Sequence, residues 1–182
     1  DPERIYLVGA SYGAITGTTL TAFDKRIRAA VLVVGGANIK VMLDAPLIKD
    51  GINNAPLHWF AKNLVAWMMK PADPKNYAHL TAGTPVLMQS GSEDTLVTPE
   101  AGKELYKALG EPKEIRWYPC DHPGLRKEDV HIVVQILDEG RDWLLEQDKP
   151  FRAADELPPP PVLESTQEQP AAVAVEGEVA AP

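Results

Sequence analysis

Four short apolar runs recur along the first two thirds of the chain, at residues 4–8, 28–34, 84–90 and 113–118. Continuous apolar runs of this length, rich in β-branched side chains, are typical of strands buried on both faces of a parallel sheet. Segments with helical character separate the runs, and this alternation favours an α/β fold. We therefore predict a parallel sheet of about four strands flanked by helices.

The helix before the fourth run has the clearest boundaries. Thr98 is suited to cap its N-terminus, Pro99 to occupy its first position, and Glu100 to place a negative charge in its first turn. The helix is expected to end just before Gly110. Residues 12–22, after the first run, carry small side chains that allow close packing against the sheet.

A last helix is predicted over about residues 127–147. Its apolar residues recur at helical spacing, which is typical of a helix that packs on a sheet. The face expected to make this contact consists of Val130, Val133, Leu137 and Leu144.

Residues 36–80 separate the second and third runs and are predicted to form a lid-like insertion. They contain an apolar, helix-like stretch at 57–69. Two interpretations of its aromatic side chains stay open. Either they form a lid over a substrate pocket, with Trp59 and Trp67 as the candidate lining residues, or they pack the insertion onto the body of the domain.

The composition changes abruptly beyond Pro150. A proline run at 158–161 is followed by residues rich in Ala, Val, Glu and Gln, which offer too little apolar surface to form a core. We predict a partial α/β domain over residues 1–150 and a disordered tail over 151–182.

The bulk composition of the 182-residue chain is ordinary for a soluble globular protein, with 45% hydrophobic and 24% charged residues. Residues 151–182 hold six acidic residues and one arginine, so −5 of the net charge of −8 belongs to the tail. The remaining −3, without a basic stripe, argues against nucleic acid as a partner. The single cysteine excludes an internal disulfide and a cysteine-rich metal cluster. No apolar run approaches about 18 residues, so no membrane span is expected; the compartment is not predicted.

The candidate chemistry begins where the first run gives way to a helix. Gly9-Ala10-Ser11-Tyr12-Gly13 has the Gly-x-Ser-x-Gly spacing, in which a sharp strand-to-helix turn presents a serine hydroxyl. We expect Gly9 and Gly13 to be required, because the turn is strained and because helix and strand approach closely there. So short a motif also arises by chance, and its weight comes from the strand before it and the partners downstream.

A nucleophilic serine needs a base, and the base needs an orienting acid, both at the carboxyl ends of neighbouring strands. Asp94 follows the third run, within residues 91–99, and His122 follows the fourth, within residues 118–124. The order Ser, Asp, His along the chain is the one expected of α/β-hydrolases.

On these three motifs the chain resembles the C-terminal half of an α/β-hydrolase and is similar to dienelactone-hydrolase-like and carboxylesterase-like members. The resemblance covers about residues 3–147. It implies Ser11 as the nucleophile, Asp94 as the acid of the pattern Gly-x-x-Asp-x-x-Val-x-Pro, and His122 as the base.

Each assignment has an alternative. Ser11 fits an ordinary tight turn, and Glu93 competes with Asp94, which is also suited to capping a helix or loop. Among the histidines His122 is favoured, since Pro123 biases it toward an extended conformation that suits a loop at a strand end. His131, by contrast, falls inside the last predicted helix.

Two further kinds of residue are interpreted as structural. Cys120 is a possible thiol nucleophile, but it does not lie in a sharp strand-to-helix turn like that of Ser11. The favoured interpretation is a small, buried, structural cysteine. His58 and His79 lie in or near the insertion and are expected to be structural rather than functional.

The resemblance implies that a small-molecule carboxylic ester is cleaved through an acyl-enzyme on Ser11, without metal or cofactor. His122 would take the hydroxyl proton, and Asp94 would hold the imidazole. The backbone N–H of Tyr12 is one expected oxyanion donor, and in this fold the other comes from a loop after an earlier strand. That strand and loop would precede Asp1. We therefore expect a missing N-terminal half of the same fold, an unpaired edge on the first strand, and poor activity of this chain alone.

Two other functions stay open. A serine peptidase of the prolyl-oligopeptidase type shares the same catalytic half but normally depends on N-terminal elements for specificity. A non-catalytic interaction protein that kept the scaffold is the third, and the complete set of three residues argues against it.

Overall fold

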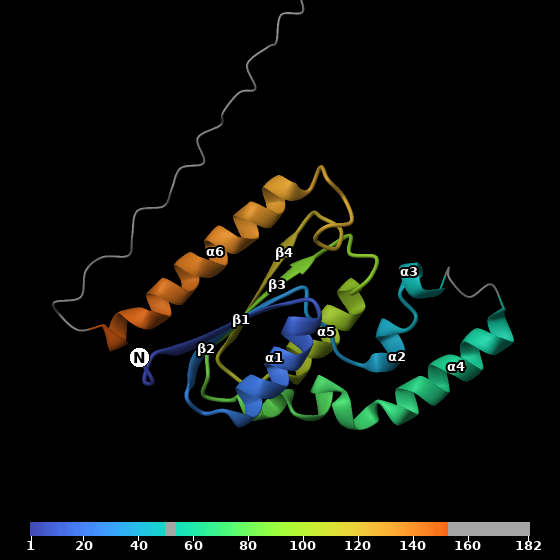
Figure 1. The fold of residues 1–182 in the computed structure, drawn as a ribbon, viewed down its shortest axis with the longest axis horizontal. Helices are drawn as coiled ribbons and strands as arrows, with labels where there is room; N and C mark the ends of the chain where they lie inside the picture. Colours follow the sequence, from blue (N-terminus) through green and yellow to red (C-terminus); the bar gives the residue numbers. More distant parts are fainter. Residues whose placement is uncertain (50–53, 153–182) are drawn as a thin grey trace, which may run out of the picture. The chain divides into compact units, whose positions relative to one another are not determined.

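The sheet predicted from the four apolar runs is present in the computed structural model (Figure 1). Its strands are β1 (Ile5–Ala10), β2 (Ile27–Val33), β3 (Val86–Gly91) and β4 (Lys113–Tyr118). All neighbouring strands pair in parallel, in the order β1-β2-β3-β4. Because each strand is followed by a helical segment on its way to the next, the predicted α/β class is confirmed.

The structure describes residues 1–49 and 54–152. Its α-helices are α1 (Tyr12–Phe23), α2 (Ile39–Met42), α3 (Pro46–Lys49), α4 (Ala55–Met68), α5 (Pro99–Ala108) and α6 (Val130–Asp148). Short 3-10 helices are η1 (Lys70–Ala72), η2 (Pro74–Asn76), η3 (Ala78–Thr81) and η4 (Lys149–Phe151). The predicted tail lies outside the described residues beyond 152, and the division of the chain at 150 stays a prediction.

Helices cover both faces of the sheet, α1 and α5 on one side and α6 on the other (Figure 1). Side chains alternate between the two faces along each strand. Leu32 and Met88 are therefore buried in the core shared with α1 and α5, whereas Val31 and Leu87 are buried in the core shared with α6. Fully burying one such side chain contributes roughly 1.5–3 kcal/mol to stability.

The predicted boundaries of α5 are confirmed. The Thr98 hydroxyl accepts a hydrogen bond from the backbone N–H of Ala101 at 3.4 Å, and Pro99 occupies the first helical position. Glu100 lies in the first turn, where its charge complements the helix dipole. This helix ends two residues before Gly110.

The predicted contact face of α6 is only partly right: Leu144 packs against the core as predicted, and Val133 is half-buried. Val130 and Leu137 are exposed, and the buried positions of the helix include Ile132, Ile136 and Gly140. The first half of α6 has apolar residues on more than one side. Helical spacing alone is therefore compatible with two different contact faces. Gly140 decides between them, because a Cβ there would lie 2.9 Å from the side-chain oxygen of Gln89 on the sheet.

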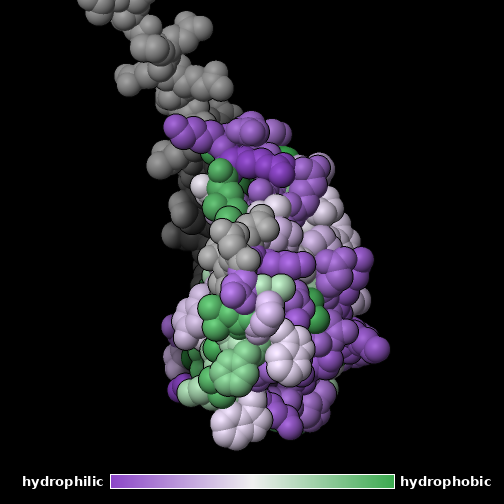
Figure 2. Space-filling model, turned by 90° about the vertical axis from the view of Figure 1, so that its right-hand side faces the viewer, coloured by the Kyte–Doolittle hydropathy of each residue, from purple (hydrophilic) through white to green (hydrophobic). Residues whose placement is uncertain are grey.

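The insertion between β2 and β3 contains the predicted apolar helix, α4. Asn54 caps it by accepting a hydrogen bond from the N–H of Leu57 at 3.0 Å. Its inner side includes the buried His58, whose Nε2 donates to the Leu43 carbonyl at 3.2 Å, a contact that agrees with the interpretation of this histidine as a structural residue. Figure 2, which views the molecule from the side on which α4 lies in Figure 1, shows apolar side chains gathered on part of that face. The exposed ones on α4 are Leu57, Trp59, Phe60, Leu64, Trp67 and Met68.

The first strand, β1, forms one edge of the sheet made by the described residues. Its Val8 side chain is exposed on the face that α6 covers elsewhere. Among the described helices, none is both long and apolar enough to cross a membrane.

Candidate active site

Ser11 lies between the last residue of β1 and the first residue of α1, at a turn with φ 53° and ψ −117°. Few non-glycine residues adopt a positive φ, and strained backbone of this kind is found in tight turns and clusters at functional sites. The Ser11 N–H donates to the Val33 carbonyl of β2 at 2.9 Å, which fixes the turn against the sheet. The local backbone therefore presents the serine side chain above the carboxyl end of the sheet.

The two glycines of the motif have different roles. A Cβ on Gly9 would lie 2.3 Å from the carbonyl oxygen of Gly13, so the predicted close approach of strand and helix is confirmed there. A Cβ on Gly13 would meet nothing within 4 Å, and its φ is not positive. The backbone of Gly13 takes part in this close approach, but the expectation that a side chain at Gly13 would clash is wrong, because its Cβ position opens onto free space.

The structure brings the three predicted residues together. His122 Nε2 lies 3.0 Å from Ser11 Oγ, and His122 Nδ1 lies 2.8 Å from Asp94 Oδ2. Asp94 and His122 are buried, and they follow β3 and β4 respectively. A single hydrogen-bonded chain thus links hydroxyl, imidazole and carboxylate across loops that are distant in sequence.

Asp94 is held by its own loop. Its Oδ1 accepts hydrogen bonds from the backbone N–H groups of Leu96 at 2.9 Å and Val97 at 2.7 Å. These bonds occupy one carboxylate oxygen and leave Oδ2 for His122. The alternative capping role of this aspartate is therefore real but does not compete with its contact to the histidine.

The competing residues lie elsewhere. Glu93 forms an ion pair with Arg126 at 2.6 Å. His131 is exposed on α6, where its Nδ1 donates to the Glu128 carbonyl at 2.8 Å, and His79 is exposed as well. Of the alternatives weighed from the sequence, Asp94 and His122 are the two that contact each other.

Cys120 is fully buried. Burial, together with the negative charges of the nearby Asp129 and Asp94, raises the pKa of its thiol to about 11. A thiol with this pKa stays protonated at neutral pH and is a poor nucleophile. The geometry agrees with the interpretation of Cys120 as a structural residue.

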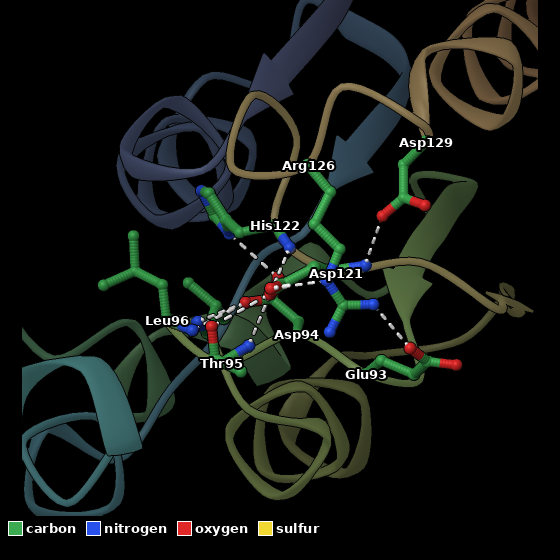
Figure 3. A network of polar contacts seen from close by, with 9 residues as sticks. Glu93, Asp94, Thr95, Leu96, Asp121, His122, Arg126 and Asp129 are labelled. Carbon is green, nitrogen blue, oxygen red and sulfur yellow. Dashed lines mark hydrogen bonds and ion pairs between the residues drawn. The ribbon is translucent and has the colours of Figure 1, made fainter.

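Sequence reasoning missed the residues that surround the acid and the histidine. Asp121, directly before His122, accepts hydrogen bonds from Thr95, and Arg126 lies between Asp121 and Glu93 (Figure 3). The sequence did contain one indication of this network, namely the acidic residue Asp121 directly before the candidate base His122. Its partners come from a loop 26 residues away, and no short-range pattern indicates that pairing.

The start of α1 offers hydrogen-bond donors next to Ser11. Tyr12 is the first residue of the helix, so its N–H has no intrahelical acceptor. The positive end of the helix dipole adds to the attraction of this position for negative charge. In the described part of the chain, no group of three His, Cys, Asp or Glu residues has the arrangement of a metal site.

Among the described residues of the insertion, Leu47 in α3 is hydrogen-bonded to the loop that bears Asp94: its N–H donates to the Thr95 carbonyl at 3.3 Å. The two predicted pocket residues lie further along. Trp59 is 64% exposed and Trp67 is 73% exposed, both on α4. Trp67 lines a cavity of about 350 Å³ with residues of α2 and α4, and the three hydrogen-bonded residues do not line it.

Several solved structures share the fold. Acetyl xylan esterase 1 from Thermoanaerobacterium sp. JW/SL YS485 matches with a TM-score of 0.62 and 23% identity, over 81% of this chain and 46% of that one. An esterase from Pyrococcus furiosus matches with a TM-score of 0.55 and 19% identity, over 83% and 55%. A puromycin-hydrolysing peptidase from Mycobacterium tuberculosis matches with a TM-score of 0.57 and 20% identity, over 82% and 22%. The chain thus spans about half or less of the length of these proteins.

No curated protein sequence matches the chain. The model of the prolyl oligopeptidase family does match it, over residues 1–146, which include all three hydrogen-bonded residues. The predicted α/β-hydrolase relationship is thereby confirmed, whereas the likeness to dienelactone hydrolases in particular stays a prediction. The chain belongs to the prolyl oligopeptidase family, within the α/β-hydrolase superfamily.

Proposed function

We propose that this chain carries the catalytic residues of a serine hydrolase that cleaves a small-molecule carboxylic ester through an acyl-enzyme on Ser11. The observation that carries the proposal is the hydrogen-bonded chain from Ser11 Oγ through His122 to Asp94. Because an ionised carboxylate only accepts hydrogen bonds, the proton of the neutral imidazole sits on Nδ1. Nε2 is then free to accept the serine proton.

In the proposed reaction, Ser11 Oγ forms a bond to the ester carbonyl carbon while its proton passes to His122 Nε2. The Asp94 carboxylate stabilises the imidazolium without taking its proton. The imidazolium then protonates the leaving alkoxide as the ester C–O bond breaks. Water attacks the acyl-enzyme, gives one proton to the same nitrogen, and releases the acid as that proton returns to Ser11.

The negative charge on the carbonyl oxygen needs donors already in place. The N–H of Tyr12 is the proposed donor from this chain, because it lies at the start of α1 beside the nucleophile. Loss of one oxyanion donor typically costs about 2.7–4 kcal/mol of transition-state stabilisation. If the second donor belongs to an earlier loop, as the resemblance implies, residues 1–182 alone will hydrolyse p-nitrophenyl esters poorly.

The labelling of Ser11 by a fluorophosphonate tests the nucleophile directly. Serine attack forms an O–P bond, fluoride leaves, and His122 takes the proton, so wild-type protein should be labelled and Ser11→Ala should not. Cys120→Ser is the matched control and should be labelled like the wild type, because the thiol is buried. Equal labelling of the wild type and Ser11→Ala would remove Ser11 from this role.

A peptidase is the second candidate function, and membership of the prolyl oligopeptidase family favours it. Both candidates use the same three residues and differ in the leaving group. Comparison of kcat/KM for p-nitrophenyl esters and peptidyl p-nitroanilides, on the same preparation, separates them. A preference for the anilides would replace the ester proposal, and the placement of Trp59 and Trp67 in a substrate pocket stays a prediction in either case.

A further inference from the structure

Asp121 lies directly before His122 and is only 6% exposed. Its Oδ1 accepts three hydrogen bonds, from the N–H of Thr95 at 2.9 Å, from the Thr95 hydroxyl at 2.9 Å, and from the N–H of His122 at 2.7 Å. Thr95 in turn directly follows Asp94. One carboxylate oxygen therefore joins the loop that bears the proposed acid to the loop that bears the proposed base.

The carboxylates of Asp121 and Asp94 both accept hydrogen bonds from the backbone N–H groups of the turn at residues 95–97. The first N–H, of Thr95, donates to Asp121, and the next two, of Leu96 and Val97, donate to Asp94 Oδ1. Because the N–H groups of Leu96 and Val97 occupy Asp94 Oδ1, its Oδ2 is directed to the imidazole of His122. The turn is thus hydrogen-bonded both to Asp94 of its own loop and to Asp121 of the neighbouring loop.

The buried charge of Asp121 is supported on its other side. Arg126 Nε lies 3.2 Å from Asp121 Oδ2 and stabilises the carboxylate (Figure 3). Asp129 accepts a hydrogen bond from the backbone N–H of Asp121 at 2.9 Å, which holds the loop and does not stabilise the side-chain charge. Burial alone would raise the pKa of Asp121. The hydrogen bonds from Thr95 and His122 and the charge of Arg126 outweigh it, so the pKa is lowered and the group is ionised at neutral pH.

We propose that Asp121 is a positioning residue, which locks the acid-bearing turn to the histidine-bearing loop so that both contacts of His122 form at once. This inference rests on the proposed function of Ser11. Its physical reason is geometric: proton transfer requires the imidazole to meet hydroxyl and carboxylate simultaneously, and a misplacement of about 1 Å can lower the rate about 10²-fold.

The test compares two buried carboxylates in the phosphonylation of Ser11 by a fluorophosphonate. Asp121→Ala removes all three acceptor contacts, and Asp121→Asn keeps an acceptor oxygen. The matched control is Asp148→Asn, since Asp148 is 5% exposed and is also paired with arginine, but at the other end of the sheet. The maximal rate of inactivation should fall about 10²-fold for Asp121→Ala and about tenfold for Asp121→Asn, and stay unchanged for the control.

Two readouts separate positioning from a general loss of structure. The half-saturating probe concentration should change by less than about twofold, because the binding surface is retained. The low-field proton signal of His122 Nδ1–H should be shifted or lost in both Asp121 variants and retained in Asp148→Asn. If Asp121→Ala does not fold, Thr95→Val takes its place, because it removes only the hydroxyl contact and should lower the rate by a smaller factor.

The outcomes are distinguishable. Folded Asp121 variants with the wild-type inactivation rate and an unchanged Nδ1–H signal would overturn the positioning role while leaving Ser11 as the nucleophile. Labelling of Ser11→Ala at the wild-type rate would instead overturn the proposed function itself, whatever the Asp121 variants do.

Discussion

Two buried carboxylates at opposite ends of the sheet have similar surroundings and different consequences. Asp148, at the end of α6, is paired with Arg4 at 2.7 Å and Arg152 at 3.0 Å, and it accepts the hydroxyl hydrogen bond of Tyr6 at 2.6 Å. Asp94, beyond the carboxyl end of β3, accepts two backbone N–H groups and an imidazole. Burial and satisfied hydrogen bonds are common to both. The difference is that one partner of Asp94, the imidazole of His122, also contacts Ser11 Oγ, and this link underlies the proposed proton transfer.

The strongest test of this comparison is the reactivity of the two carboxamide variants. Asp94→Asn should slow turnover or phosphonylation by a factor on the order of 10⁴, because the amide favours the wrong imidazole tautomer. Asp148→Asn should leave the rate within about twofold of the wild type. Fluorophosphonate inactivation at pH 7.5, with circular dichroism as the check on folding, measures both. A similar loss in the two variants would abolish the distinction.

Asp148→Asn, which should hardly change the rate, should instead lower the free energy of unfolding. Asp148→Asn leaves two arginines without their carboxylate, and we expect a loss of about 2 kcal/mol, below the usual value for a buried pair because Arg4 and Arg152 keep partial access to water. Urea unfolding of wild type and variant, at equal slopes, gives this difference. An unchanged midpoint would show that the ion pairs at this end contribute nothing to stability.

The dependence of stability on pH should follow the Asp148 end of the sheet. Hydrogen bonding and charge from Arg4 lower the pKa of Asp148, despite its burial. Its contribution is therefore full above the unfolded pKa of about 4 and is lost as the pH falls below that value. Burial and the hydrogen bond to Asp148 raise the pKa of Tyr6 to about 12. The Tyr6 contribution is thus full below about pH 10 and is lost as the pH rises toward 12.

Unfolding free energies measured across the pH range check both directions. The gap between wild type and Asp148→Asn should be constant near neutrality and shrink in acid. A gap that widens in acid would contradict the assignment.

The smallest expected effect concerns the neighbour of the proposed acid. Glu93 forms an exposed ion pair with Arg126, and such surface pairs contribute about 0–1 kcal/mol. Arg126 also keeps its contact with Asp121 when Glu93 is changed. Glu93→Gln should therefore alter the phosphonylation rate by less than about threefold. A loss comparable to that of Asp94→Asn would reopen the choice between the two adjacent acids.

The sequence predicted the sheet well because buried parallel strands leave an unmistakable run of apolar residues. It also predicted Ser11, Asp94 and His122 as partners, since each follows a strand and the carboxyl ends of parallel strands meet. The structure confirms that these side chains lie within hydrogen-bond distance. Prediction succeeded where a local pattern, or the rule that parallel strands end at the same edge of a sheet, determined the outcome.

Prediction failed where a distant neighbour decided. The contact face of α6 depends on the fit of Gly140 against Gln89, which no helical periodicity contains. The role of Asp121 depends likewise on Thr95, which is adjacent in space and not in sequence. For Gly13 the error was of another kind, because a motif position was assumed to have the same steric reason as its partner Gly9.

The backbone at Ser11 has a consequence for the balance between durability and reactivity. A residue with a side chain at φ 53° gives up about 1–3 kcal/mol relative to a relaxed conformation, and glycine avoids most of this penalty. Ser11→Gly should therefore melt at a higher temperature than the wild type, whereas Ser11→Ala keeps the Cβ atom and the penalty with it. At this turn the variant without the hydroxyl, Ser11→Gly, would be the more thermostable protein, and the wild type would keep its hydroxyl with a lower melting temperature.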